Sequence, residues 1–185
     1  MKVMFISDIH GMITNLDKIS ERFHSLGCQK LVVLGDLYYA DYYHRLEEDY
    51  QPKEVLHFLK SFADKLICIR GNCDSDLDIM ESEFPIEEKI LHYPIDSYNI
   101  YLTHGHIYNE CNWKEENSIL IFGHYHYPFI KEDHNNLFIN PGSISLPRNN
   151  STFSYLYYDG DSFTIYDLHN HVIAKKELDD SKKII

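Results

Sequence analysis

Residues 3–10 read Val3-Met4-Phe5-Ile6-Ser7-Asp8-Ile9-His10, an apolar run followed closely by the polar side chains of Asp8 and His10. Four more apolar runs of three or four residues are followed in the same way by a polar cluster. Runs of this length are typical of buried strands. The five pairs are Val3–Ile6 with Asp8-Ile9-His10, Leu31–Leu34 with Gly35-Asp36, Leu66–Ile69 with Gly71-Asn72-Cys73-Asp74, Ile100–Leu102 with Thr103-His104-Gly105-His106, and Ile119–Phe122 with Gly123-His124-Tyr125-His126. Since the loops after parallel strands meet at one edge of a sheet, we expect the clusters to share one crevice.

Helical signals separate the first three apolar runs. Thr14 or Asn15 is expected to cap a helix that runs to about Leu26 and stops at Gly27. Pro52 is expected to open a second helix, which ends before the third run. This order of strand, helix, strand, helix and strand indicates right-handed crossovers and a parallel sheet at the core.

Beyond about residue 86 the chain changes to a series of strand patterns. The expected strands are Lys89–His92, Asn99–Leu102, Ile119–Phe122, Leu137–Ile139, Phe153–Tyr158 and Phe163–Leu168. Asp159-Gly160-Asp161, between the last two, is typical of a hairpin turn. We therefore expect an α/β fold in which two sheets pack face to face with helices outside, in a single domain over residues 1–185.

The composition, with 44% hydrophobic and 25% charged residues, is that of an ordinary globular protein. The formal net charge of -12 disfavours long nucleic acids, because affinity for their phosphates comes largely from Lys and Arg contacts. No apolar run approaches the ~20 residues of a membrane span, and the apolar stretch near Met1 is too short for a secretory signal. The four cysteines form no CxxC pair, and a chain of this length needs no disulfide. We expect a cytoplasmic protein that binds neither a membrane nor long nucleic acids.

The polar clusters supply side chains of the types that hold metal ions. Asp36 has two carboxylate oxygens, so it can bridge two cations. Any one of the histidines alone would more often be an ordinary polar residue than a ligand. Five strand ends that all carry a ligand type together predict a metal site. The candidate ligands are Asp8, His10, Asp36, Asn72, His104, His124 and His126.

In this order, the motifs DIH, GD, GNCD, THGH and GHYH resemble those of the calcineurin-like metallophosphoesterase superfamily, over residues 3–148. Four longer stretches look like the small bacterial YfcE-type phosphodiesterases: GNCDSDLD at 71–78, FPI at 84–86, THGH at 103–106 and NPGSISLPR at 140–148. The resemblance implies a four-layer αββα sandwich with two mixed β-sheets, which agrees with the fold expected from the apolar pattern. It also gives the loop Asn140-Pro141-Gly142-Ser143 a structural role near the site.

The resemblance divides the ligands between two metals. Asp8, His10, Asp36 and His126 are expected to hold the first, and Asp36, Asn72, His104 and His124 the second, so that Asp36 is the bridge. The family's metals are commonly Mn, Fe, Zn or Ni, and oxygen and imidazole ligands allow all four. We expect two divalent metal ions per chain, with manganese first and iron, zinc or nickel as alternatives.

Two such dications would attract a phosphate anion and deprotonate a water near neutral pH. We therefore expect a metal-dependent phosphodiesterase that hydrolyses small phosphodiesters with a metal-bridging hydroxide. Many phosphatases of the superfamily have a histidine, which protonates the leaving group, where this chain has Cys73. A thiol of pKa about 8.5 is a weaker acid than an imidazolium, so activated aryl diesters are favoured. His106 is expected either to replace the missing donor or to orient a ligand. The catalytic candidates are Asp36, Asn72, Cys73, His104 and His106.

Other functions are weighed against this one. A phosphomonoesterase or nucleotidase on the same fold is the first alternative, and Cys73 argues against it. A non-catalytic scaffold like the retromer subunit, which resembles this fold, is the second, and the complete ligand set counts against it. The tyrosine-rich segment Tyr38–Tyr50 either covers a sheet edge or forms a substrate rim or subunit interface, and we expect a homo-oligomer.

Overall fold

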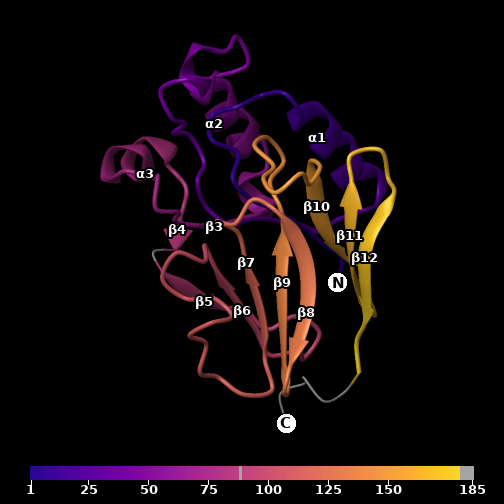
Figure 1. Ribbon diagram of the computed structural model, residues 1–185. Helices are drawn as coiled ribbons and strands as arrows, with labels where there is room; N and C mark the ends of the chain where they lie inside the picture. Colours follow the sequence, from indigo (N-terminus) through magenta and orange to yellow (C-terminus); the bar gives the residue numbers. More distant parts are fainter. Residues whose placement is uncertain (88, 180–185) are drawn as a thin grey trace.

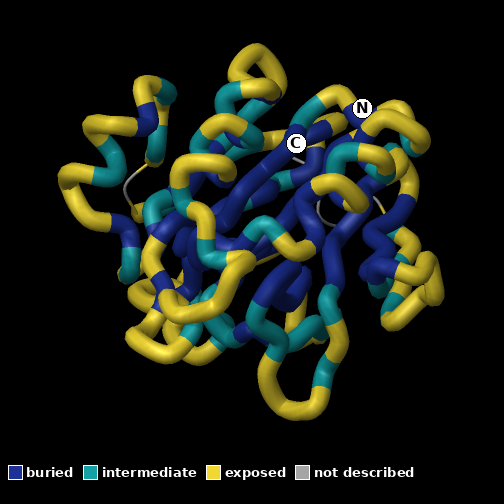
Figure 2. The backbone as a smooth tube through the Cα atoms, turned by 90° about the horizontal axis from the view of Figure 1, so that it is seen from above, coloured by how far each residue is buried: buried dark blue, intermediate teal, exposed yellow. Residues whose placement is uncertain are grey.

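Twelve strands and three α-helices make up most of the regular structure in the computed structural model, which describes residues 1–87 and 89–179. The helices are α1 (Leu16–Ser25), α2 (Pro52–Ser61) and α3 (Asp76–Ser82), and two short 3-10 helices span His44–Leu46 and Ala63–Lys65. Buried strands occupy the centre of the molecule and exposed loops surround them (Figure 2).

Strands from the first half of the chain and from its last part build a seven-stranded mixed sheet. The strand order is β12-β11-β10-β1-β2-β3-β4. Four neighbours run parallel: β1 (Val3–Ile6), β2 (Lys30–Val33), β3 (Leu66–Ile69) and β4 (Ile86–Glu87). The other three are antiparallel to their neighbours: β10 (Ser154–Tyr158), β11 (Ser162–Asp167) and β12 (Val172–Glu177). The parallel core predicted from the first three apolar runs is confirmed, as is the hairpin between β10 and β11.

The second sheet has five strands in the order β5-β6-β7-β9-β8. These are β5 (Ile90–His92), β6 (Ile100–Thr103), β7 (Ile119–Phe122), β9 (Asn136–Pro141) and β8 (Pro128–Asp133). The central strands β6, β7 and β9 run parallel and lie side by side in Figure 1, whereas β5 and β8 are antiparallel edges.

The two sheets pack face to face through buried apolar side chains. Phe5 of β1 and Leu102 of β6 belong to the same cluster between the sheets. Because side chains alternate along a strand, Met4 points to the other face, where it shares a cluster with Phe23 of α1 and Leu59 of α2. The expected α/β fold with two mixed sheets is therefore confirmed.

A loop covers the outer face of the five-stranded sheet. Leu120, Phe122 and Phe138 form a third buried cluster there, and Trp113, from the loop before β7, packs against it. Within the described part of the chain, no α-helix contributes to this cluster.

Helix α3 and three strands, β4, β8 and β12, are absent from the sequence predictions, and β4 has only two residues. Helix α3 has Ser82 as its one buried residue, while Leu77 and Met80 are exposed, so its sequence lacks an apolar stripe. The strands β8 and β12 lie at the edges of their sheets and are largely exposed, so they lack the alternation of a half-buried strand.

The predicted cap of the first helix is wrong in its chemistry. Asn15 does precede α1, but its side chain makes no capping hydrogen bond. Its Nδ2 atom instead donates to the carbonyl oxygen of Ile144, 2.7 Å away. The asparagine therefore ties the start of α1 to the loop that follows β9.

The fold brings the polar clusters to one edge of the sheets. The backbone N–H of Asp8 donates to the carbonyl oxygen of Gly35 (3.1 Å), and that of His10 donates to Asp36 (2.9 Å), so the loops after β1 and β2 touch. The parallel pairing of β6 and β7 likewise places the loops after them next to each other. Among the helices of the described residues, none is long and apolar enough to cross a bilayer.

Candidate metal centre

Side chains from all five polar clusters meet at the edge of the two sheets where the loops after β1, β2, β3, β6 and β7 lie. The ligand atoms of two groups lie within 4.8 Å of one another, and the groups are Asp8, His10, Asp36 and His126, and Asp36, His104 and His124. Asn72 joins the second group, because its Oδ1 atom lies 3.0 Å from Nε2 of His104. The structure thus brings together the seven side chains that the sequence predicts as ligands.

Three of the imidazoles are oriented in the same way. In each, Nδ1 lies within hydrogen-bond distance of a backbone carbonyl oxygen, which can only accept, so Nδ1 carries a proton. The pairs are His10 with Tyr39 (2.6 Å), His104 with Leu34 (2.6 Å) and His126 with Leu146 (2.7 Å). In the neutral ring, Nε2 then presents its lone pair to the centre, as a metal-ligating histidine does.

The atoms of the first group that face the centre are hydrogen-bond acceptors that lack a donor. Asp8 is fully buried, and its Oδ1 atom finds no hydrogen-bond partner among the described residues. This oxygen lies 3.3 Å from Nε2 of His126, which in turn lies 3.3 Å from Nε2 of His10. A carboxylate oxygen and two imidazole lone pairs repel one another at these distances unless a cation lies among them. The donor set therefore fits a divalent metal.

Asp36 lies between the two groups. Its Oδ2 atom is 3.5 Å from Nε2 of His10 and 3.4 Å from Nε2 of His104, while its Oδ1 atom accepts the backbone N–H of Cys73 at 2.9 Å. Burial acts to raise the pKa of Asp36, but hydrogen bonding and charge from His104 outweigh it and lower the pKa. Burial acts to lower the pKa of His104, but Asp36 and Asp8 raise it to about 9. The carboxylates of Asp36 and Asp8 therefore favour a positive charge at this position.

Two further imidazoles, those of His124 and His126, favour the neutral form. Burial lowers the pKa of His124, and the nearby His104 lowers it further. Burial also lowers the pKa of His126. Neutral imidazoles are the form in which histidine binds metals.

Five of the candidate ligands adopt left-handed backbone conformations. Their φ angles are 55° at Asp8, 53° at His10, 55° at Asp36, 68° at His124 and 62° at His126. Such angles are uncommon outside glycine, although Asp and His tolerate them better than most residues. They turn the side chains sharply off the strand ends, and strained residues of this kind cluster at functional sites.

Gly71 allows two of the ligand loops to touch. A Cβ atom at this position would collide with Oδ1 and with the backbone nitrogen of Asp36. A side chain here would therefore push the Asn72 loop away from Asp36.

Asp74 holds the same two loops together. Its Oδ2 atom accepts the backbone N–H groups of Asp36 (2.9 Å) and Gly71 (2.7 Å), and its Oδ1 atom accepts that of Leu37 (2.7 Å). The sequence shows Asp74 inside the Gly71-Asn72-Cys73-Asp74 cluster, but not this role, because its three partners are backbone groups.

Serines of the loop after β9 hold the Asp8 turn. Ser143 Oγ donates to the carbonyl oxygen of Asp8 (2.8 Å), and Ser145 Oγ lies within reach of the carbonyls of Asp8 (2.7 Å) and Ile9 (2.8 Å). Asn140 donates to the carbonyl oxygen of Gly123 at 2.6 Å. These contacts agree with the structural role expected for this loop, and they add Ser145, which the sequence interpretation missed.

Two clefts flank the centre. The first, which we name the His126 cleft, has a volume of about 350 Å³, and its lining includes His10, Tyr39, Cys73, His126, Leu146 and Arg148. The second, of about 300 Å³, is lined by Arg70, Asn72, Lys89 and His106 among others. The two candidate proton donors therefore lie on different sides. Burial and the charge of Asp36 raise the pKa of Cys73 to about 12, and burial and His104 lower the pKa of His106.

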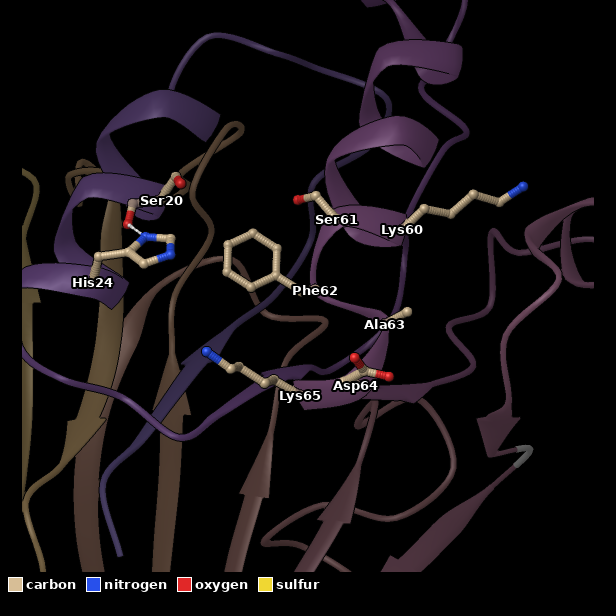
Figure 3. Close-up of a pocket in the computed structure, with 8 residues that line it drawn as sticks. All are labelled: Ser20, His24, Lys60, Ser61, Phe62, Ala63, Asp64 and Lys65. Carbon is tan, nitrogen blue, oxygen red and sulfur yellow. Dashed lines mark hydrogen bonds between the residues drawn. The ribbon is translucent and has the colours of Figure 1, made fainter.

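A third cleft, of about 360 Å³, contains none of the predicted site residues. Figure 3 shows His24 of α1 on one side, Lys60 of α2 on the other, and Phe62 between them. Lys60 pairs with Glu83 at 2.8 Å, and Lys65 lies over an aromatic ring of α1. No buried charged group points into this cleft from the residues that line it.

The segment Tyr38–Tyr50 is partly exposed. Tyr42 and Tyr43 expose 63% and 79% of their surface, whereas Tyr38 is buried. Its Tyr39 reaches the His126 cleft, so the segment forms one rim of the centre.

Residues 1–162 match the calcineurin-like phosphoesterase superfamily domain. The chain is 35% identical over 175 residues to Phosphodiesterase YfcE of Escherichia coli strain K12, covering 94% of this chain and 95% of that protein. The solved structure of E. coli YfcE, described as a phosphoesterase, matches with a TM-score of 0.90 and 35% identity over 97% of this chain and all (100%) of that one.

A more distant likeness extends to zinc-complexed Vps29 of Entamoeba histolytica, with a TM-score of 0.58 and 21% identity over 95% of this chain and 96% of that one. At this identity the likeness shows the fold alone. The domain match and the YfcE relative agree with the ligand geometry. The chain belongs to the calcineurin-like phosphoesterase superfamily.

Proposed function

We propose that this protein is a dinuclear metal-dependent phosphodiesterase that hydrolyses small phosphodiesters. The observation that carries the proposal is the convergence of three imidazole Nε2 atoms on the carboxylates of Asp8 and Asp36, with Asp8 Oδ1 left without a partner among the described residues. The YfcE relative, whose name gives its activity as that of a phosphodiesterase, supports the choice of reaction.

In this proposal every ligand except Asp36 serves one metal. Asp8, His10 and His126 would hold the first metal, and Asn72, His104 and His124 would hold the second, with Asp36 shared between them. Manganese is our first choice for both ions, and iron, zinc and nickel are alternatives that the oxygen and nitrogen ligands also accept.

Bound dications supply a positive charge for the phosphate and lower the pKa of water. The water oxygen bonds to phosphorus, one ester P–O bond breaks, and the products are a phosphomonoester and an alcohol or phenol. The protein must position the ligands and provide for the proton of the leaving oxygen. The Cys73 thiol, with its pKa raised to about 12, is a poor donor at neutral pH. We therefore propose that the enzyme prefers leaving groups that need little protonation, with His106 as the alternative donor.

We also propose a cytoplasmic location and a homo-oligomer. The exposed Tyr42 and Tyr43 of the Tyr38–Tyr50 segment support the second point, because aromatic side chains are enriched in subunit interfaces.

The test is a panel of substrates with the metal-free protein reconstituted with Mn²⁺, Fe²⁺, Zn²⁺ or Ni²⁺. The substrates are bis(4-nitrophenyl) phosphate, 4-nitrophenyl phosphate, nucleotides, cyclic nucleotides and sugar phosphates. Metal-dependent turnover of the diester above the monoester supports the proposal. Faster monoester turnover favours a phosphomonoesterase, and two bound metals without any turnover favour a scaffold.

A pair of histidine variants ties the activity to the centre. His104→Ala should strongly reduce turnover, whereas His134→Ala, which removes an exposed imidazole between β8 and β9, should leave it unchanged. Equal activity in the two variants would contradict the proposed site.

A further inference from the structure

The His126 cleft carries an arginine whose charge is not used within the described structure. The chain has four arginines in all: Arg22, Arg45, Arg70 and Arg148. Arg70 pairs with Asp76 at 2.6 Å, and Arg45 lies over the ring of Tyr39 at 5.1 Å. Arg148 lines the cleft beside the candidate ligands His10 and His126, and no carboxylate of the described residues pairs with it.

The backbone fixes Arg148 relative to the centre. Its N–H donates to the carbonyl oxygen of His126 at 2.9 Å. Its own carbonyl oxygen accepts Ser151 Oγ at 2.6 Å and the Ser151 N–H at 3.0 Å. The guanidinium therefore extends from a held position next to a candidate ligand, although the residue itself is exposed.

One acidic side chain of the cleft lies outside the candidate ligands, and its oxygens bond within its own loop. Among the described lining residues it is Asp41. Its Oδ1 atom accepts the backbone N–H groups of Tyr43 (2.9 Å) and His44 (3.1 Å), and its Oδ2 atom lies 2.9 Å from Nδ1 of His44. Asp41 pairs with His44, so Arg148 is the charged side chain in the described lining of the cleft that has no ion-pair partner.

The remaining lining suits an organic group. Leu146, Pro147 and Tyr39 give the lining apolar and aromatic surface. The volume of about 350 Å³ lies toward the small end of ligand sites, which span roughly 300–1,000 Å³. One aromatic or sugar-sized ring fits this space.

We propose that the His126 cleft receives an ester group of the phosphodiester substrate, and that Arg148 selects ester groups bearing an anionic substituent such as a carboxylate or a phosphate. The inference rests on the proposed function, since it names the class of diester that the same centre takes. Arg148 is a specificity residue here: it binds the substrate without taking part in the bond changes.

The test compares substrates of equal shape and different charge. 4-Nitrophenyl 4-carboxybenzyl phosphate and its 4-carbamoylbenzyl counterpart share a leaving group, so the ratio of their kcat/KM values reports charge recognition on the retained ester. A second pair carries the carboxylate or the carboxamide on the leaving nitrophenyl ring, which covers the opposite orientation of the diester in the site.

In the wild type we expect the anionic member of one pair to have the higher kcat/KM. In Arg148→Gln the ratio of the two kcat/KM values should fall about tenfold, as for loss of a charge-assisted hydrogen bond. Arg148→Lys should retain part of it, because the charge remains while the planar fork is lost. Arg22→Gln, which removes an equal charge from α1, should leave both ratios unchanged.

The outcomes separate the two proposals. If the metal-loaded wild type cleaves no diester, the proposed function fails. If it cleaves the carboxamide diesters but shows no anionic preference in either pair, or if Arg148→Gln keeps the wild-type ratio while its melting temperature and metal content are normal, the inference about Arg148 is overturned.

Discussion

Replacing Asp36 with asparagine should weaken both groups of ligands at once, because Oδ2 lies 3.5 Å from Nε2 of His10 and 3.4 Å from Nε2 of His104. The substitution preserves the shape of the side chain. Oδ1 can still accept the Cys73 N–H, and the new amide can donate to an imidazole lone pair. The fold should therefore persist, and the main loss is one unit of negative charge.

The size of the effect follows from that charge. Two unit charges about 3.5 Å apart interact by about 5 kcal/mol at an effective dielectric constant of about 20, and we take this as the minimum for a carboxylate beside a divalent ion. If the amide dipole recovers about half of this, the loss is about 2.5 kcal/mol, or somewhat under 100-fold in affinity. Since metals stabilise the transition-state charge by several kcal/mol, turnover at a fixed metal concentration should fall by about 10³-fold.

The assay is calorimetric titration of metal-free protein with Mn²⁺, together with kcat/KM for a nitrophenyl diester. Asp64→Asn is the matched control, since it removes the same charge from an exposed residue outside the centre. Asp36→Asn should lose more activity than any other single ligand variant, and its metal content should fall. Two tightly bound ions per chain with near-normal turnover would refute the bridging role.

Four further results are expected. Cys73→His should raise alkyl monoester hydrolysis by about 10²-fold, with less gain for aryl diesters, if leaving-group protonation is limiting; an unchanged preference in a metal-loaded variant would show that position 73 does not set specificity. Asp74→Asn should lower stability by about 2 kcal/mol and the melting temperature by about 4–8 °C, because an amide cannot accept all three N–H groups; an unchanged melting curve would contradict this role. In the metal-free protein the raised pKa of His104 adds stability that is complete below about pH 6.5 and is lost as pH rises through about 9. Melting temperatures in chelator should fall over that window, and His104→Gln should remove the fall. Serine at both Tyr42 and Tyr43 should shift the protein toward monomers in light scattering, and a wild-type monomer at micromolar concentration would rule out the proposed interface.

The sequence predicts the buried strands well because burial leaves a direct mark on residue type. The runs at β1, β2, β3, β6 and β7 are apolar and short, and the structure contains a strand at each. Exposed elements leave no such mark, which explains why β8 and β12 are missing from the prediction. A signal for α3 exists, since Ser75 and Asp78 form a capping box, but the helix buries too little for periodicity to reveal it.

In the candidate centre, too, the sequence indicates some groups and not others. Ligand types and their positions after strands can be read from residue names, so all seven expected side chains could be identified before their geometry was known. The groups that orient them could not, because the carbonyl oxygens of Leu34, Tyr39 and Leu146 occur in every residue. The cap predicted at Asn15 fails for a related reason: a distant backbone acceptor, that of Ile144, competes for its amide.

The pairing of His10 with His126 has a mechanical consequence. These residues are 116 positions apart, in loops that follow strands of different sheets, and their Nε2 atoms are 3.3 Å apart. A cation bound by both residues would close a long loop of chain, as a disulfide does. Closing a loop of about 100 residues lowers the conformational entropy of the unfolded chain and so stabilises the fold by up to about 4.7 kcal/mol. The centre would then act as a removable cross-link between the two sheets. Chelation would therefore lower the folding stability of the whole protein as well as stop its chemistry.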